Sequence, residues 1–299
     1  GLYYTLASGE ALSDLHLEFS TSNLSAVIAH AVTATGLVVH GGKTAFDIDA
    51  AAVLTDCHAY DTAVGTDTGD AFAVGTTGLT ATRCGFSRTD GFTFTSTGSV
   101  LSSCGGISAW DDGFQAVAGG AFTANNCFVI DGGKEDVAGN SGFNTEQATS
   151  AMTLNGCLAY KAGKNGIAAG TGYNPVSIVN CIAISNTTLD INDAGGGTFT
   201  ENNNAFETDN ITPDATDITS NLGIDTAELD AVAAMTNVAL RAWINAPDNA
   251  LDGTSRLKGA GAYTAVQRDI RGRRRSIPTT IGPWEFTSGD EANTRTARS

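Results

Sequence analysis

The chain contains 299 residues with a formal net charge of −16; 41% of them are hydrophobic and 16% are charged. The hydrophobic share is large enough to build a core, which excludes a wholly disordered chain, and only 5 prolines exclude a collagen. The longest apolar runs, such as residues 36–39, are too short for a transmembrane helix. Because an acidic body repels phosphates and anionic lipids, we expect neither a nucleic acid nor a membrane as partner.

Six cysteines mark a repeat between residues 53 and 184. The octets around them are VLTDCHAY, TATRCGFS, VLSSCGGI, TANNCFVI, TLNGCLAY and SIVNCIAI. An apolar residue lies three positions before each cysteine, and most octets have a small or apolar residue two positions after it. This spacing breaks strict alternation, so it indicates a strand that bends near the cysteine.

A second repeated feature is an apolar anchor between successive cysteines. The anchors are Phe72, Phe92, Phe114, Phe143, Ile167 and Ile191, at intervals of 20, 22, 29, 24 and 24 residues. The distance from an anchor to the next cysteine is nearly constant, whereas the distance from a cysteine to its own anchor varies. Each repeat therefore has one fixed segment and one position that accepts insertions.

A period of 20–29 residues indicates a solenoid. A leucine-rich horseshoe is excluded because the leucine ladder is absent, and the Gly, Thr, Ser, Asn and Val content favours short strands and turns. We therefore predict an all-β fold in which residues 1–206 form a single-stranded parallel β-helix of about eight rungs, each with three short strands.

This fold predicts how the repeated side chains are used. Equivalent positions on successive rungs stack, so the cysteines should form a buried column of free thiols, and the phenylalanine anchors should form a second inward stack. Asn126 and Asn180 directly precede their cysteines, and we expect them at turns, where Asn tolerates left-handed geometry.

The repeat fades after residue 206. Residues 207–250 are predicted as a loop and a short helix at 226–240, where Leu229, Val232, Thr236 and Leu240 follow helical spacing. Because the terminal repeats of a solenoid need caps, we expect this helix to pack against an open end.

Three phrases follow in order: GTSRLKGAG (253–261), DIRGRRR (269–275) and IGPWEF (281–286). This ending resembles that of the right-handed parallel β-helix proteins of the pectate-lyase-like superfamily, with Arg256 in place of the usual Pro and Pro283-Trp284 in place of Ala-Tyr. The resemblance implies a right-handed coil and a wrap-back segment at 251–286, and the polar residues 287–299 should form a flexible tail. The family includes lyases, hydrolases, adhesins and phage virion proteins, so it does not fix an activity.

The best candidates for catalysis are Asp90, Asp111 and Asp112, which would form an acidic stripe on one face. Within the resembling family, lyases hold Ca²⁺ with acidic clusters, and hydrolases use two or three close carboxylates. The alternative is that these Asp residues, two of them in Asp-Gly pairs, are ordinary turn residues. We expect no cofactor and no metal, with Ca²⁺ only under the lyase alternative.

Two further groups are candidates for binding. An insertion carries Lys134, Glu135 and Asp136, and the next repeat carries Lys161 and Lys164; together they would form a binding loop or a loop-stabilising ion pair, with a lyase base as a third alternative. Arg271, Arg273, Arg274 and Arg275 form the densest positive charge, either a docking patch for another subunit or a clamp onto carboxylates of the body.

The sequence favours a non-enzymatic protein that acts by surface contact, most of all a phage virion component such as a head-decoration, fibre or tailspike protein. A durable solenoid with free thiols suits folding in a reducing cytosol and later residence on a virion or extracellular surface. The expected partners are other virion proteins or further copies of the chain, for example in a homotrimer, and a surface glycan. The alternatives are a polysaccharide lyase or glycoside hydrolase, and a bacterial surface adhesin.

Overall fold

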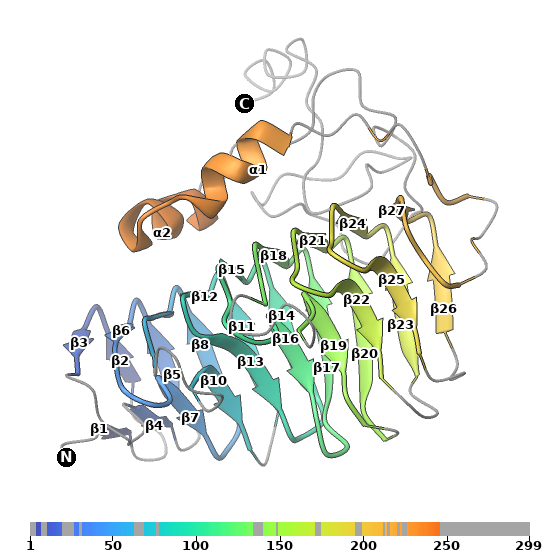
Figure 1. Cartoon of the computed structure of the whole chain (residues 1–299). Coiled ribbons are helices and arrows are strands. Elements are labelled where there is room, and N and C mark those ends of the chain that lie inside the picture. Colours follow the sequence, from blue (N-terminus) through green and yellow to red (C-terminus); the bar gives the residue numbers. More distant parts are fainter. Residues whose placement is uncertain are drawn as a thin grey trace, which may run out of the picture.

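The computed structural model describes residues 4–6, 11–19, 27–29, 32–62, 69–75, 78–133, 140–147, 149–170, 175–194, 199–211, 213, 216–219, 222 and 226–245. The chain passes through one short strand of each of three sheets per turn, and successive turns stack along a rod (Figure 1). Each sheet contains nine parallel strands in the described part of the chain. The predicted all-β parallel solenoid of about eight rungs is therefore confirmed.

The strands are short, between two and five residues, because the chain must turn a corner after each of them. The first sheet contains β1 (Tyr4–Leu6), β4 (Val27–Ala29), β7 (Phe46–Ile48), β10 (Asp70–Val74), β13 (Asp90–Phe94), β16 (Phe114–Ala116), β19 (Phe143–Thr145), β22 (Asn165–Ala169) and β25 (Leu189–Asp193). The second contains β2 (Ala11–Ser13), β5 (Thr33–Thr35), β8 (Ala52–Thr55), β11 (Leu79–Thr82), β14 (Ser99–Ser102), β17 (Ala121–Asn125), β20 (Ala151–Asn155), β23 (Val176–Val179) and β26 (Phe199–Asn202). The third contains β3 (His16–Glu18), β6 (Val38–His40), β9 (His58–Tyr60), β12 (Gly85–Ser87), β15 (Gly105–Ile107), β18 (Phe128–Ile130), β21 (Leu158–Tyr160), β24 (Ile182–Ile184) and β27 (Ala205–Phe206).

A residue in the left-handed region makes the corner between the second and third sheets. It directly precedes the cysteine in all six octets, with φ of 54° at Asp56 and Asn126 and 56° at Asn180. Asn and Asp adopt this conformation at lower cost than other side chains with a Cβ. The predicted turn role of Asn126 and Asn180 is confirmed, and the corner explains why alternation breaks at each cysteine.

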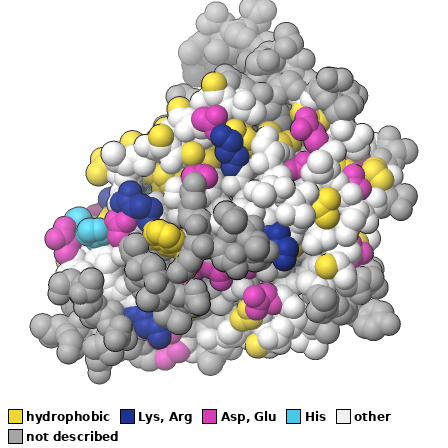
Figure 2. All heavy atoms as spheres, in the orientation of Figure 1, with side chains coloured by type: hydrophobic (Ala, Val, Ile, Leu, Met, Phe, Trp, Pro, Cys, Tyr) yellow, Lys and Arg dark blue, Asp and Glu magenta, His cyan; other side chains and the backbone are white. Residues whose placement is uncertain are grey.

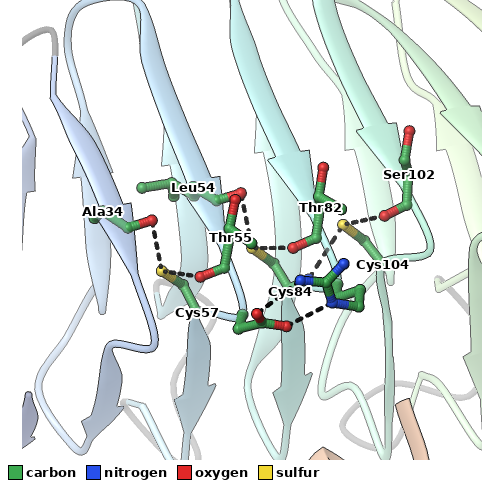
Figure 3. Close-up of polar contacts among 10 residues, drawn as sticks. Ala34, Leu54, Thr55, Cys57, Thr82, Cys84, Ser102 and Cys104 are labelled. Atoms are coloured by element: carbon green, nitrogen blue, oxygen red, sulfur yellow. Dashed lines mark hydrogen bonds and ion pairs between the residues drawn. The ribbon is translucent and has the colours of Figure 1, made fainter. Parts of the chain in front are cut away.

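The cysteines form the predicted buried column, and all six are free thiols. Figure 3 shows Cys57, Cys84 and Cys104 in a row, with their sulfur atoms directed at backbone carbonyl groups. The Cys84 Sγ lies 3.6 Å from the Leu54 carbonyl oxygen of the preceding turn, and the Cys57 Sγ lies 3.5 Å from the carbonyl oxygen of Thr55. Each thiol therefore fills the corner and finds a weak hydrogen-bond acceptor there.

The predicted phenylalanine stack is also confirmed, and it lies on the inner face of the first sheet. The stacked rings are those of Phe46, Phe72, Phe92, Phe114 and Phe143, with successive centroids 4.8, 4.2, 5.1 and 4.9 Å apart. Phe86 packs edge-on against this stack from the third sheet. Its ring explains the glycine in the next octet, because a Cβ on Gly106 would clash with the Phe86 ring.

Two helices cover the outer face of the third sheet, where β18, β21 and β24 are buried on both faces. They are α1 (Thr226–Ala233), which contacts β18, and α2 (Asn237–Asn245), which contacts β12 (Figure 1). Their side chains Leu229, Leu240 and Trp243 pack with the outward residues of the sheet. Neither helix has the length and apolar character needed to cross a membrane; this holds for the described residues only.

The prediction for this segment is wrong in two respects. The single helix predicted over 226–240 is replaced by two helices, α1 and α2. Thr236 caps the second helix, because its Oγ1 accepts a hydrogen bond from the Ala239 N–H at 3.3 Å. The helices also lie along the flank of the coil instead of its open end, where they bury the apolar outer face of the third sheet.

Candidate functional site

The structure brings the three candidate aspartates together where the chain passes from the third sheet into the first. Asp90 begins β13, directly beside Asp70 of β10 in the strand register, while Asp111 and Asp112 lie in the connection before β16. Asp90 and Asp112 are buried, with exposed fractions of 7% and 4%. The three aspartates therefore form an acidic cluster that is largely buried.

The carboxylates of this cluster hold the coil together. The Asp90 Oδ1 accepts a hydrogen bond from the Asp111 backbone N–H of the next turn at 3.0 Å. Asp112 accepts the backbone N–H of Ser141 in the following turn, and its Oδ2 accepts the side-chain amides of Gln115 at 2.9 Å and Asn144 at 2.8 Å. The geometry thus supports the turn interpretation of Asp90 and Asp112.

Asp190 repeats this arrangement near the end of the solenoid. Its Oδ2 accepts the backbone N–H groups of Glu207 and Thr208, both at 3.0 Å, and its Oδ1 accepts the side-chain amide of Asn186 at 2.8 Å. A carboxylate at this corner therefore satisfies backbone donors of the next turn in three places along the rod, as buried polar groups require.

Burial also changes the acidity of the cluster. Burial, together with the negative charges of Asp111 and Asp70, raises the pKa of Asp90 to about 8. Burial and Asp111 likewise raise the pKa of Asp112 to about 8, against the opposing hydrogen bond from Asn144. Strongly shifted carboxyl groups are typical both of buried structural sites and of catalytic acids.

Of the other predicted site residues, the structure describes Lys161 and Lys164. Lys161 lies at the turn after β21, where its Nζ is 2.5 Å from the Asp230 Oδ1 of α1 and 5.3 Å from the centre of the Tyr160 ring. Lys164 lies between β21 and β22, and its backbone N–H donates to the Asn140 carbonyl. Lys161 therefore attaches α1 to the third sheet through this ion pair. Lys134, Glu135, Asp136, Arg271, Arg273, Arg274 and Arg275 lie outside the described residues, as do the segments 251–286 and 287–299.

A pocket that the sequence did not predict lies between α2 and the outer face of the third sheet, with a volume of about 270 Å³. It is lined by His16, Glu18, Val38, His40, Tyr60, Asn237, Val238 and Arg241. The His40 Nε2 lies 3.0 Å from the Asp61 Oδ2, and the Tyr60 hydroxyl donates to the Asn237 carbonyl at 3.2 Å. The lining comes from four separate segments, so no single motif could have revealed it.

His58 lies on the same sheet face, two residues before Tyr60 of the pocket. Burial, with the positive charge of Arg241, lowers the pKa of His58 to about 3, so the ring is neutral at physiological pH. Neither ring nitrogen has a hydrogen-bond partner among the residues described. Across the described part of the chain, no group of three or more His, Cys, Asp or Glu residues is placed to hold a metal ion.

The second sheet has an outer face without charge, which we name the second-sheet face. Its outward residues are Ala11, Ser13, Thr33, Thr35, Val53, Thr55, Thr80, Thr82, Val100, Ser102, Ala121, Thr123, Asn125, Ala151, Thr153, Asn155, Ser177, Val179, Thr200 and Asn202. Their outward direction follows from the alternation of burial along each strand, as in β8, where Ala52 and Leu54 are buried and Val53 is exposed. On the side of the molecule in Figure 2, acidic and basic side chains are scattered over the described surface.

Comparison of the chain with protein-family models, with curated proteins and with solved structures finds no match.

Proposed function

We propose that the protein is a non-enzymatic structural protein that acts by surface contact, as a phage virion component of the head-decoration, fibre or tailspike type. The observation that carries the proposal is the use of the acidic cluster: Asp90 and Asp112 bind backbone N–H groups of the next turn. The carboxyl oxygen atoms of both residues therefore have a structural role in the coil. This role explains why Asp90 and Asp112 are present without invoking catalysis.

The thiols and the ending of the chain support the virion assignment. Six buried free thiols suit a protein that folds in a reducing cytosol, and phage components assemble in the host cytosol before lysis. The three phrases between residues 253 and 286 resemble the ending of pectate-lyase-like β-helix proteins, a superfamily that includes virion proteins. The solenoid supplies the durable body that such a role needs.

A polysaccharide lyase or glycoside hydrolase is the second candidate, and one observation favours it. The pKa values of Asp90 and Asp112 are raised to about 8, so either carboxyl group could hold a proton at neutral pH, as a general acid must. Asp111 lies beside both and is only half-buried, so it would be the more accessible carboxylate of such a site.

An activity assay separates the two candidates. The purified protein is incubated with acidic and neutral polysaccharides, with and without Ca²⁺, and reducing ends and unsaturated products are measured. We expect no turnover. The informative variant is Asp111→Asn, since Asp112→Asn would disturb a buried hydrogen-bond network; Asp131→Asn, at another turn, is the matched control. Turnover that Asp111→Asn abolishes and Asp131→Asn preserves would establish the enzyme instead.

A further inference from the structure

The second-sheet face differs from the rest of this acidic chain. The chain carries a net charge of −16, yet none of the outward positions on the nine strands of the second sheet is charged. The first sheet, by comparison, has Asp47 and Asp70 at half-buried positions on its strands. Two of the three large hydrophobic side chains that are exposed among the described residues also lie on the second-sheet face: Val53, 44% exposed, and Val100, 41% exposed.

The face is also shaped for contact. It is a parallel sheet of small, β-branched and Asn side chains in regular rows, because equivalent residues such as Thr80 and Val100 are direct neighbours in the strand register. Beside Val100, the small residues Ala121 and Ala151 leave a hollow of about 150 Å³. An uncharged surface with an exposed Val beside a hollow can interdigitate with an identical surface.

We propose that the second-sheet face binds a second copy of this chain, face to face and with two-fold symmetry. Copies with a net charge of −16 repel one another, and this repulsion is weakest where the approaching surfaces carry no charge. Identical patches meet most simply about a two-fold axis. The two sheets would then pack as in a β-sandwich, roughly 10 Å apart.

The available area agrees with a dimer of modest affinity. Nine strands spaced roughly 4.8 Å apart, each about four residues long at roughly 3.3 Å per residue, form a face of roughly 500 Å². Two such faces would bury about 1,000 Å² in total, which is at the lower limit for a specific protein interface. The fraction of dimer should therefore change with protein concentration within the range that can be measured.

Sedimentation velocity of the full-length purified chain tests the proposal at several concentrations and at low and high salt. We expect a monomer–dimer equilibrium that shifts toward the dimer at high salt, because salt screens the repulsion between acidic copies. Val100→Lys or Val53→Lys places an unpaired charge in the uncharged interface and should weaken dimerisation about tenfold or more. Val238→Lys, on α2, makes the same chemical change at the third exposed hydrophobic residue and should leave dimerisation unchanged.

Val100→Thr is the folding control, since it keeps a β-branched neutral side chain and should retain the dimer. A wild-type chain that stays monomeric at all concentrations and salt conditions would overturn the proposal. The second-sheet face would then bind another segment of the chain or a neutral ligand. A dimer or trimer that Val100→Lys leaves intact, or that Val238→Lys weakens equally, would also overturn it. Because purified protein is used, this result is independent of the virion assignment.

Discussion

Phe72 and Phe92 lie on consecutive turns of the coil with their ring centroids 4.2 Å apart and their planes within 5° of parallel. The two residues are also direct neighbours in the strand register of the first sheet. A side chain at one place in the repeat thus packs on its own equivalent in the next turn. Each turn depends on its neighbours for burial, as expected of a solenoid.

Replacing Phe114 by Ala tests this coupling, because Phe114 is fully buried between Phe92 and Phe143. The substitution leaves a cavity and removes the ring contacts with Phe86, Phe92, Phe122 and Phe143, so the free energy of unfolding should fall by ~3–5 kcal/mol. Urea unfolding measures the change, with Phe114→Leu as a smaller truncation that should cost less. A loss below about 1 kcal/mol for Phe114→Ala would contradict the packing of the stack.

The thiols should be unreactive until the protein unfolds. All six cysteines are buried, and burial raises the pKa of the Cys84, Cys127 and Cys181 thiols, which disfavours the reactive thiolate. Thiol counting should find no rapidly labelled group in the native protein and six in denaturant. Cys127→Ser should cost ~1–3 kcal/mol if the hydroxyl finds no partner. The Asn125 carbonyl, 3.6 Å from the Cys127 Sγ, is an acceptor that could reduce this cost.

Asp90 should make the protein less stable as the pH rises. Its pKa is about 8 in the folded chain, because of burial and of the nearby Asp111 and Asp70, against roughly 4 in the unfolded chain. Between these values the folded protein holds a proton that the unfolded chain has released, so this contribution to stability is complete below about pH 4 and is lost as the pH rises to about 8.

The matched variant is Asp90→Asn, which stays neutral and keeps an Oδ1 acceptor for the Asp111 N–H. Chemical unfolding at several pH values should show that the wild type loses more than about 1 kcal/mol relative to the variant across this window, since each pKa unit is worth about 1.4 kcal/mol. Equal pH profiles for the two proteins would show that folding does not raise the pKa of Asp90.

The helical cover of the third sheet should depend on Trp243. Its ring meets that of Phe128 edge-on with centroids 5.1 Å apart, and it is 6% exposed. Trp243→Ala should destabilise the protein by ~3–5 kcal/mol and uncover apolar residues of the sheet, which a hydrophobic dye would report. Val238→Ala, at an 81% exposed position of the same helix, should change neither quantity.

Much of the solenoid could be predicted because its repeats are short and regular. The cysteine octets and the anchors from Phe72 to Phe143 indicated two inward columns, and both exist because equivalent positions on successive turns must stack. The variable distance after each cysteine correctly marked the connection between the third and first sheets as the place of insertions, such as the one between Ile130 and Phe143.

The parts that depend on contacts distant in sequence could not be predicted. The triplets after Cys127 and Cys181 are wholly apolar and buried on both faces of the third sheet, but nothing in them pointed to α1 and α2 as the cover. The ion pair between Lys161 and Asp230 joins residues 69 positions apart. The pocket at Arg241 arises only when the second helix lies on the N-terminal turns of the coil.

The virion assignment is tested most directly by immunogold electron microscopy of purified phage particles whose genome encodes this chain, with mass spectrometry of the same particles. We expect regular labelling of the particle surface and peptides from the chain in stoichiometric amounts. Deleting residues 132–139, or reversing the charges of Arg273, Arg274 and Arg275, should reduce this incorporation without loss of the fold. Particles that lack the chain, together with soluble protein that cleaves a polysaccharide and loses this activity in Asp111→Asn, would contradict the account.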